Sequence, residues 1–352
     1  MKTGTFVSTC LLLGLIASSG PATAVKPYEI TELGTLRGDT YAWDINGSAQ
    51  VVGVSASSTG YNHAFLWENG VMQDLGTLGG SWSWAYGINA SGQVVGSSAT
   101  GSGEDYEAAL WEDGVMRGLG TLGGSGSSAR DINDSGQVVG WAYTAGGAQH
   151  AFLWEDGVMQ DLGTLDGCTS SQAKAVNDSG HVVGHARTPS GDSRAFLWKD
   201  GVMTELGTLG GSSGHAYDIN DSGQVAGASY TADGDWHAFL WENGVMQDLG
   251  TPGGSWSAAY GINDSAQVVG DGGTAFLWEN GVMYRISDLI PDDPLSPYFD
   301  ESRGINDLGQ VVGSGYYDKR RCAFLVTPIP EPSALGLLAF ASLVAIRCLR
   351  RV

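Results

Sequence analysis

The chain contains few cysteines and few basic residues, and each shortage argues against particular kinds of site or partner. Of its 4 cysteines in 352 residues, Cys10 and Cys348 lie in the terminal segments. The other two, Cys168 and Cys322, fall in different sequence repeats, so we expect no disulfide, and the cysteines show no metal-site spacing. Lysine and arginine number 17 against 38 aspartates and glutamates, a formal charge of −21. This balance disfavours a nucleic-acid partner, because phosphates are bound by lysine and arginine.

The sequence also lacks recognisable catalytic motifs. It has no Gly-x-Ser-x-Gly elbow and no phosphate-binding loop in a fitting context, and no pair of carboxylates stands out. His181 and His185 lie on one expected strand, roughly 13 Å apart, too far for a single metal ion. Three further histidines share one repeat position, which favours packing or a strand-end hydrogen bond over catalysis: His63, His150 and His237. We therefore expect no catalytic residue, no cofactor and no metal.

What the chain does have is a repeat. Glycine accounts for 55 residues, which indicates many tight turns, and a hydrophobic content of 42% argues against general disorder. An Ile-Asn motif followed by Gln-Val-Val-Gly recurs at a spacing of 43 or 44 residues, and its asparagines are Asn46, Asn89, Asn133, Asn177, Asn220, Asn263 and Asn306. An Ala-Phe-Leu-Trp motif recurs with it and ends at Trp67, Trp111, Trp154, Trp198, Trp241, Trp278 and, in the last copy, Val326.

Each repeat predicts four strands. In one copy we expect strands over 130–133, 137–143, 150–154 and 158–162, because these runs are rich in β-forming residues and are separated by Asp, Ser and Gly. The turn between the third and fourth strands is an Asx-Gly pair, which predicts a type I′ hairpin. It occurs at Asn69-Gly70, Asp113-Gly114, Asp156-Gly157, Asp200-Gly201, Asn243-Gly244 and Asn280-Gly281. No middle segment shows a helical period.

A four-stranded unit of about 43 residues is typical of a β-propeller blade. Residues 28–36 align with a fourth strand, and the last repeat stops after its third strand at Val326. The N-terminal strand is therefore expected to pair with the last repeat and to supply its fourth strand. We expect an all-β, seven-bladed propeller closed by that pairing, because closure removes exposed sheet edges. An open β array is the alternative.

Both termini carry targeting signals. Lys2, an apolar run and the small residues Ala22 and Ala24 predict a signal peptide over 1–24, cleaved before Val25. The domain boundaries are then 1–24, the seven repeats over 25–327, and a C-terminal tail over 328–352. That tail contains an apolar stretch over 334–346, which in a helix spans roughly 20 Å, short for a bilayer core.

The tail combines a Pro-Glu-Pro motif, a short apolar helix and a terminal arginine cluster, and its key residues are Pro330, Glu331, Pro332, Arg347, Arg350 and Arg351. It resembles the PEP-CTERM sorting signal of Gram-negative bacteria. The resemblance implies an exosortase-type processing enzyme as a partner and insertion in the membrane through the tail helix before processing. An ordinary tail anchor is the alternative.

The repeats resemble the HAF-repeat family through His63-Ala64-Phe65, His150-Ala151-Phe152 and His237-Ala238-Phe239. The other copies replace the histidine with Glu107, Arg194, Thr274 or Cys322. Members of this family are described as extracellular repeat proteins, and the resemblance implies no activity.

Three further features are candidates for a site. The segments 131–136 and 218–223 are similar to the start of a calcium loop, but they lack its last ligand, so a hairpin turn is favoured. Four tryptophans lie near expected loops, where they would stack on sugars: Trp82, Trp84, Trp236 and Trp256. The non-repeated segment 287–303 is expected to be an irregular blade junction or a functional loop.

We expect an exported, non-enzymatic monomer at the cell envelope or in the extracellular matrix, binding exopolysaccharide or matrix proteins in a biofilm. A carbohydrate-active propeller enzyme and a calcium-stabilised adhesion module are the alternatives. Polar residues that differ from repeat to repeat and converge on the central channel would favour the enzyme. Repeated apolar or glycine positions there would oppose it.

Overall fold

The computed structural model describes residues 27–101, 105–290 and 299–330. These residues form 28 strands and one short helix. The predicted signal peptide and nearly all of the predicted sorting tail lie outside the described residues. Among the residues described, there is no helix with the length and apolarity needed to cross a membrane.

The fold is all-β and consists of antiparallel four-stranded units. Four of them are separate sheets. The first contains β2 (Thr40–Ile45), β3 (Val51–Ala56), β4 (Asn62–Glu68) and β5 (Val71–Asp74), and the second contains β14 (Ser170–Val176), β15 (Val182–Arg187), β16 (Ser193–Lys199) and β17 (Val202–Glu205). The third contains β18 (Gly210–Ile219), β19 (Val225–Thr231), β20 (Trp236–Glu242) and β21 (Val245–Gly250), and the fourth contains β22 (Ala258–Ile262), β23 (Val268–Asp271), β24 (Ala275–Glu279) and β25 (Val282–Arg285).

Two further units share one eight-stranded sheet. They are β6 (Ser83–Ile88), β7 (Val94–Ala99), β8 (Tyr106–Glu112) and β9 (Val115–Gly118), followed by β10 (Gly123–Ile132), β11 (Val138–Thr144), β12 (Gln149–Glu155) and β13 (Val158–Gly163). Gly126 of β10 pairs in parallel with Tyr106 of β8 and joins them. By hydrogen bonding the described residues therefore form six sheets, where the sequence predicts seven.

The last sheet combines the two ends of the described chain. It contains β26 (Phe299–Ile305), β27 (Val311–Tyr317) and β28 (Arg320–Pro328), and β1 (Tyr28–Glu32) is its edge strand. β1 pairs antiparallel with β28, with Tyr28 opposite Pro328 and Ile30 opposite Val326. Ile329 donates its backbone N–H to Pro27 at 2.8 Å, so the ordered fold extends slightly beyond the predicted boundary at 327.

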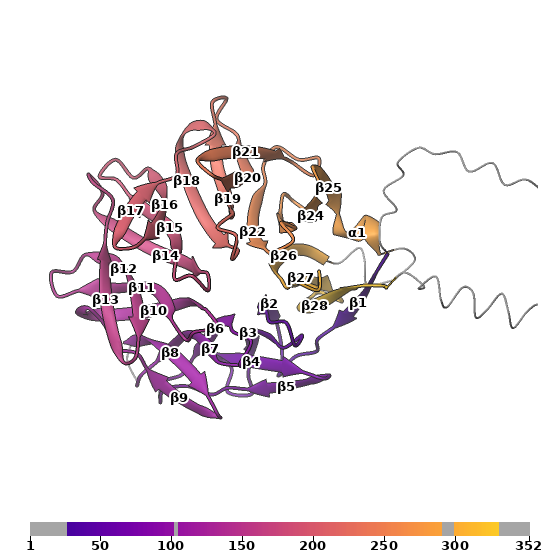
Figure 1. The fold of residues 1–352 in the computed structure, drawn as a ribbon. Coiled ribbons are helices and arrows are strands. Elements are labelled where there is room, and N and C mark those ends of the chain that lie inside the picture. The colour runs from indigo at the N-terminus through magenta and orange to yellow at the C-terminus, as the bar shows by residue number, and fades with distance from the viewer. Residues whose placement is uncertain (1–26, 102–104, 291–298, 331–352) are drawn as a thin grey trace, which may run out of the picture.

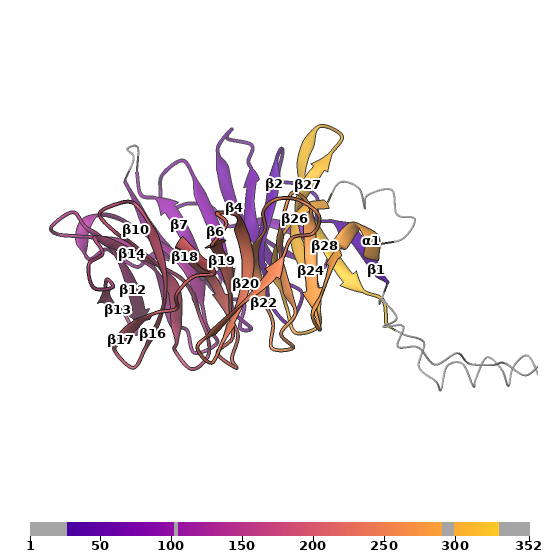
Figure 2. The ribbon, with the colours of Figure 1, turned by 90° about the horizontal axis from the view of Figure 1, so that it is seen from above.

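The sheets lie side by side around a central axis, as Figure 1 shows, with the first strand of each unit toward the middle and the fourth at the periphery. Seen from the side, the hairpin loops project from two opposite faces (Figure 2). The short helix α1 (Ile286–Leu289) follows β25 and buries Ile286 and Leu289. It begins the segment predicted to be an irregular junction, of which residues 291–298 lie outside the described residues.

The repeated glycine and phenylalanine explain how the sheets pack. The phenylalanine of each Ala-Phe-Leu-Trp motif is fully buried in six units. Gly53 lies opposite Phe65 on the neighbouring strand, and a Cβ there would collide with the Tyr41 carbonyl and press on the Phe65 ring. The second strand therefore carries glycine at this position, because a Cβ would collide with the backbone carbonyl of the first strand, as it also would at Gly96, which lies opposite Ala109.

The repeated asparagines link each inner strand to the next. Asn133 illustrates the pattern: its Nδ2 donates to Gln137 Oε1 at 2.8 Å and to the Asn177 carbonyl at 3.0 Å, while its Oδ1 accepts the Gln137 N–H at 2.9 Å. The Asn-to-Asn bonds join Asn46 to Asn89, Asn89 to Asn133, Asn133 to Asn177, Asn177 to Asn220, Asn220 to Asn263, Asn263 to Asn306, and Asn306 to Asn46.

The predicted type I′ turns are confirmed. Asn69 and Gly70 have φ values of 51° and 84°, and the other five Asx-Gly pairs also have positive φ at both positions. The pairing leaves the third and fourth strands of each unit in register across a two-residue loop.

Candidate functional site

A β-bulge occurs at the same place in every inner strand. In each, one residue is left out of the pairing with the second strand, and these residues are Trp43, Tyr86, Arg130, Lys174, Tyr217, Tyr260 and Arg303. A bulge re-aims the side chain of its extra residue. The same seven residues line one cavity of about 320 Å³, which we call the axial cavity.

Side chains from adjacent sheets stack on one another in the axial cavity. The Trp43 and Tyr86 rings are parallel within 6°, with centroids 4.6 Å apart. The Arg130 guanidinium carbon lies 4.1 Å from the Tyr86 ring centroid, and that of Arg303 lies 4.0 Å from the Tyr260 centroid. These contacts fix the directions of the two guanidinium groups, because a cation over an aromatic face is attracted by the ring.

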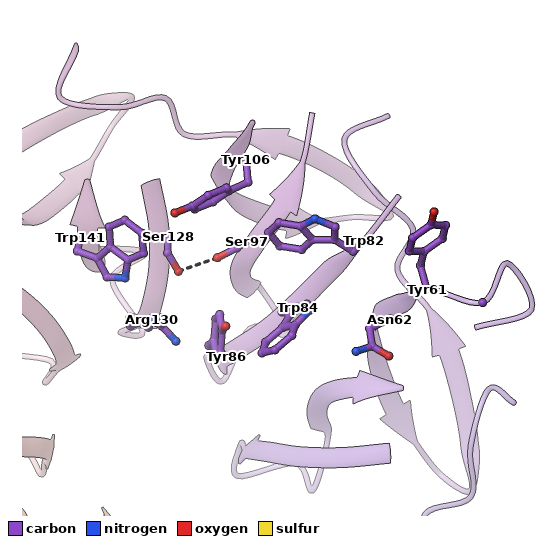
Figure 3. Close-up of a pocket in the computed structure, with 11 residues that line it drawn as sticks. Tyr61, Asn62, Trp82, Trp84, Tyr86, Ser97, Tyr106, Ser128, Arg130 and Trp141 are labelled. Atoms are coloured by element: carbon purple, nitrogen blue, oxygen red, sulfur yellow. Dashed lines mark hydrogen bonds between the residues drawn. The ribbon is translucent and has the colours of Figure 1, made fainter. Parts of the chain in front are cut away.

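A larger cavity of about 470 Å³ adjoins the axial cavity, and we call it the aromatic pocket. Figure 3 shows its side chains, which come from three neighbouring four-stranded units. It is lined by Gly60, Tyr61, Asn62, Trp82, Trp84, Tyr86, Ser97, Tyr106, Ser128, Arg130 and Trp141. Tyr86 and Arg130 line both cavities, so the two adjoin at these residues.

The aromatic pocket has aromatic walls and a small polar base. The Tyr106 ring lies between Trp82 and Trp141, with centroid distances of 5.6 Å and 6.1 Å. At the base Ser97 and Ser128, both buried, are hydrogen-bonded through their Oγ atoms at 2.6 Å (Figure 3). Apolar ring faces together with a few placed polar groups are the features of a small-ligand pocket.

A pair of half-buried histidines lies near the axial cavity. The rings of His185 (β15) and His215 (β18) are stacked at 4.2 Å, and His215 Nδ1 lies 3.1 Å from the Tyr217 hydroxyl. Burial lowers the pKa of both, that of His215 to about 4, so both rings are neutral at pH 7. The charged groups that lower these pKa values further are all basic: His215 and then Lys174 for His185, and Lys174 and then Arg187 for His215.

Three aspartates lie one residue after the bulge and use their oxygens to tie sheets together. Asp131 Oδ1 accepts the N–H of Ile132 at 2.8 Å, and its Oδ2 accepts the N–H of Val176 on the next inner strand at 2.8 Å. Asp44 and Asp218 make the equivalent two contacts, one to the next residue of their own strand and one to the inner strand of the next unit. Burial raises the pKa of all three, to about 7 for Asp44, about 6 for Asp131 and about 8 for Asp218.

These contacts bear on the calcium-like segments 131–136 and 218–223. The Gly136 N–H donates to the Asn133 carbonyl and the Gly223 N–H to the Asn220 carbonyl, which confirms the hairpin turns that the sequence favours. In the first aspartate of each segment, both carboxylate oxygens accept hydrogen bonds from backbone N–H groups. Within the described ranges, no cluster of three or more His, Cys, Asp or Glu side chains has an arrangement suited to a metal ion.

The repeated histidines make the predicted strand-end contact. His63 Nδ1 lies 2.9 Å from the Asp74 carboxylate, and His150 and His237 contact Asp161 and Asp248 in the same way. Where Arg194 replaces the histidine, it lies 3.4 Å from Glu205. The two cysteines of the repeats, Cys168 and Cys322, are free thiols.

The remaining candidates from the sequence separate into three groups. Trp82 and Trp84 line the aromatic pocket. Trp236 packs against the ring of Tyr230 at 4.7 Å, and Trp256 is 38% exposed in the segment before β22. Of the sorting and cleavage residues the structure describes only Pro330, which is exposed. The others lie outside the described residues: Ala22, Ala24, Val25, Glu331, Pro332, Arg347, Arg350 and Arg351.

Sequence reasoning missed Tyr86, Tyr106, Arg130 and Trp141. Their strands are correctly predicted in outline, but the pocket exists only where neighbouring units meet. One signal was available: the residue three positions before each repeated asparagine varies among Trp, Tyr, Arg and Lys, all large side chains, beside the nearly constant Ile-Asn pair. That variable position is the bulged one.

Comparison with known proteins shows the fold and no family. No protein-family model matches the chain, and no curated protein matches it. Among solved structures, the chain is similar to a puromycin-hydrolyzing peptidase from Mycobacterium tuberculosis, with a TM-score of 0.54 and 11% identity over 84% of this chain and 53% of that one. It is also similar to YCF48 bound to D1 peptide, with a TM-score of 0.50 and 14% identity over 89% and 100%.

A gluconolactonase from Xanthomonas campestris matches with a TM-score of 0.43 and 10% identity, over 88% of this chain and 94% of that one. The chain spans about half the length of the peptidase. At identities this low the likeness concerns the fold alone, which is an all-β fold of the β-propeller type.

Proposed function

We propose that the chain is an exported, non-enzymatic β-propeller of seven blades that binds extracellular polysaccharide through its aromatic pocket. The observation that carries this proposal is the set of aromatic faces formed by Trp82, Trp84, Tyr106 and Trp141 around a polar base. Sugars present C–H groups that stack on aromatic faces and hydroxyls that need hydrogen-bond partners. A pocket with both features, 470 Å³ in volume, suits one or two sugar units.

Three contacts support a ring of seven blades. β1 pairs with β28, Asn306 donates to the Asn46 carbonyl at 3.0 Å, and the inner strand β26 contacts the inner strand β2. The merged eight-stranded sheet then counts as two blades, since a single residue pair joins its halves. In this proposal β1 completes the seventh blade and leaves the protein without a gap between its first and last units.

The terminal sequences support export. The signal-peptide pattern with cleavage before Val25 directs the chain across a membrane, and the Pro330-Glu331-Pro332 motif with its apolar stretch and arginines resembles a sorting signal. We propose that an exosortase-type enzyme processes the tail. The propeller is then held at the cell envelope or released as a monomer into a biofilm matrix, in which it acts as a binding or scaffold component.

The test is a glycan-array screen of the purified protein, followed by titration of each glycan that binds. Trp84→Ala removes an aromatic wall and is expected to weaken binding by about threefold to tenfold, since an aromatic stacking contact contributes roughly 0.5–1.5 kcal/mol. Trp256→Ala is the matched control, because Trp256 is an exposed tryptophan outside the pocket. An array without binding, or equal losses in both variants, would contradict the proposal.

A carbohydrate-active propeller enzyme is the second candidate. It is favoured by the axial cavity, where the bulged residue is aromatic in four units and cationic in three instead of being repeated. Lys174 lies there with its pKa lowered to about 7 by burial and by Arg130, which makes it a candidate base. Incubation with each bound glycan and mass spectrometry of the products tests this candidate, and intact glycans would exclude it.

A further inference from the structure

Three basic side chains converge on one cavity of a strongly acidic protein. Arg130 (β10), Lys174 (β14) and Arg303 (β26) come from three different sheets and line the axial cavity together with four aromatic residues. The chain has only 17 basic residues against 38 acidic ones. Convergence of three cations is therefore a feature of this cavity and not of the overall composition.

All three of these side chains have unused hydrogen-bonding capacity. Arg130 Nε is buried and has no hydrogen-bond partner among the described residues, and its guanidinium is held over Tyr86. Lys174 Nζ donates to the neutral Gln172 side chain at 3.1 Å. Arg303 differs, because Glu301 accepts a hydrogen bond from its Nη2 at 2.9 Å, although its Nε is also unpartnered. A buried guanidinium N–H without an acceptor is costly, so a bound group that accepts from it is favoured.

The electrostatic surroundings of Lys174 point the same way. The charge that lowers its pKa, after burial, is that of Arg130. The pKa values of the neighbouring His185 and His215 are lowered first by burial, and the charged groups that lower them further are all basic. The carboxylates that lie deeper along the axis, such as Asp131, are engaged by backbone N–H groups. The side of the axial cavity at Arg130 and Lys174 therefore has an excess of positive charge.

This positive region adjoins the aromatic pocket. Arg130 lines both cavities, and Figure 3 shows its side chain below Ser128 and beside Tyr86. A sugar stacked against Trp84 or Trp141 would have its ring substituents near the Arg130 guanidinium, because Arg130 lines the same pocket. A hydroxyl of a neutral sugar can accept one N–H from this arginine, whereas a carboxylate would accept from it in a stronger two-point, charge-assisted contact.

We propose that the ligand of the aromatic pocket is an acidic saccharide whose anionic group is bound by Arg130 and Lys174. This inference rests on the proposed polysaccharide-binding function and specifies the chemical class of its ligand. The shared chemistry is an anionic substituent on a sugar ring, either the carboxylate of a uronic acid or a sulfate ester. The aromatic residues bind the ring, and the basic residues select the charge.

The experiment compares three oligosaccharides of the same backbone by titration calorimetry with the full-length protein: a uronic-acid oligomer, its carboxyl-reduced neutral form and a sulfated form of the neutral oligomer. We expect the uronic-acid oligomer to bind about tenfold to a hundredfold more tightly than the neutral form, the usual range for a charge-assisted hydrogen bond. Tighter binding by the sulfated form instead would assign the anionic group to a sulfate.

Variants separate the charge from the aromatic platform. Arg130→Gln and Lys174→Gln are expected to remove the preference for the acidic oligomer, so that each variant binds the acidic and neutral forms with affinities within about twofold of each other. Arg117→Gln is the matched control, because that arginine is exposed and lies over Trp154, away from the pocket. Melting curves of each variant show whether the fold is retained, and Lys174→Gln keeps the test valid should Arg130→Gln unfold.

The outcomes distinguish this inference from the function on which it rests. Equal affinity for neutral and acidic forms, unchanged in Arg130→Gln and Lys174→Gln, would overturn the charge selection while leaving polysaccharide binding intact. Binding by none of the three oligomers, with no hit on a glycan array, would overturn the proposed function itself.

Discussion

Two of the seven asparagine turns carry alanine where the other five carry glycine. Ala49 and Ala266 have φ values of 60° and 57°. The equivalent residues of the other turns are Gly92, Gly136, Gly180, Gly223 and Gly309, all with positive φ. A residue with a Cβ is strained in this region by roughly 1–2 kcal/mol. Glycine avoids this strain, but its greater conformational freedom in the unfolded chain offsets part of the gain in stability.

We expect Ala266→Gly to raise the free energy of unfolding by up to about 1 kcal/mol, measured by urea denaturation. Ala90→Gly is the control, because Ala90 is exposed in an equivalent turn and does not have positive φ. This control should lower stability slightly. A loss of stability in both variants would show that the left-handed conformation is not strained for alanine here.

The asparagine amides connect neighbouring units, and each amide group has a defined direction. Asn220 is buried; its Nδ2 donates to Gln224 Oε1 at 2.8 Å and to the Asn263 carbonyl at 3.1 Å. In Asn220→Asp an oxygen would face two acceptors, so we expect a loss of roughly 1–3 kcal/mol in urea unfolding.

The matched control for this change is Asn243→Asp. Asn243 begins a type I′ turn in which three other units carry aspartate at the same place, namely Asp113, Asp156 and Asp200. Its stability should stay within about 0.5 kcal/mol of the parent. If Asn220→Asp were as stable as this control, the amide links would not hold the units together.

The pairing of β1 with β28 is expected to contribute to the whole fold. Ile30 is buried in the cluster that contains Val326 and Phe324, so Ile30→Ala should lower the free energy of unfolding by roughly 2–5 kcal/mol. Ile329→Ala is the control, since that side chain is 41% exposed. Should unfolding followed by tryptophan fluorescence be unchanged in Ile30→Ala, β1 would be a detachable edge and ring closure would fail with it.

The strands show how far sequence patterns reach and where they stop. Strands predicted over 150–154 and 158–162 are observed as β12 and β13 with nearly the same bounds. The strand predicted over 130–133 begins instead at Gly123, where it pairs with Thr144. Its Gly-Gly-Ser-Gly start has no intrinsic strand preference, so only tertiary pairing reveals it. Helix α1 was missed because four residues are too few to show a period.

The aromatic pocket shows the limit for sites between units. Trp82 and Trp84 were candidates from the sequence because they lie beside expected loops. Tyr106 and Trp141 belong to strands of two different units, and no local pattern says that their rings meet 6.1 Å apart. Arg130 joins them only because a bulge turns its side chain toward the axis. Repeats thus predict the framework, and the site depends on departures from the repeat.

The pH dependence of the whole molecule combines opposing groups near the axis. Burial, and then the charge of Asp131, raises the pKa of Asp218 to about 8, against about 4 in an unfolded chain. Between these values the folded state binds a proton that the unfolded state releases. The stability that this group contributes is therefore fully present below about pH 4 and is lost as the pH rises through 8. Asp44 and Asp131 act in the same direction.

The lowered pKa values of His185 and His215 act in the opposite direction, because the unfolded state then binds more protons in acid.

The contribution of Asp218 alone is isolated by comparing the stability of the parent with that of a variant at this position. Asp218→Asn does not titrate and places an amide nitrogen opposite a backbone N–H, so we expect a loss of roughly 1–3 kcal/mol or more at pH 5. Because the parent itself loses stability toward pH 8, the gap between parent and variant should narrow over that range. The exposed Asp233→Asn control should show a constant gap. A gap for Asp218→Asn that is equally constant from pH 5 to pH 8 would mean that this carboxyl group is ionised throughout, and that its two backbone N–H donors outweigh its burial.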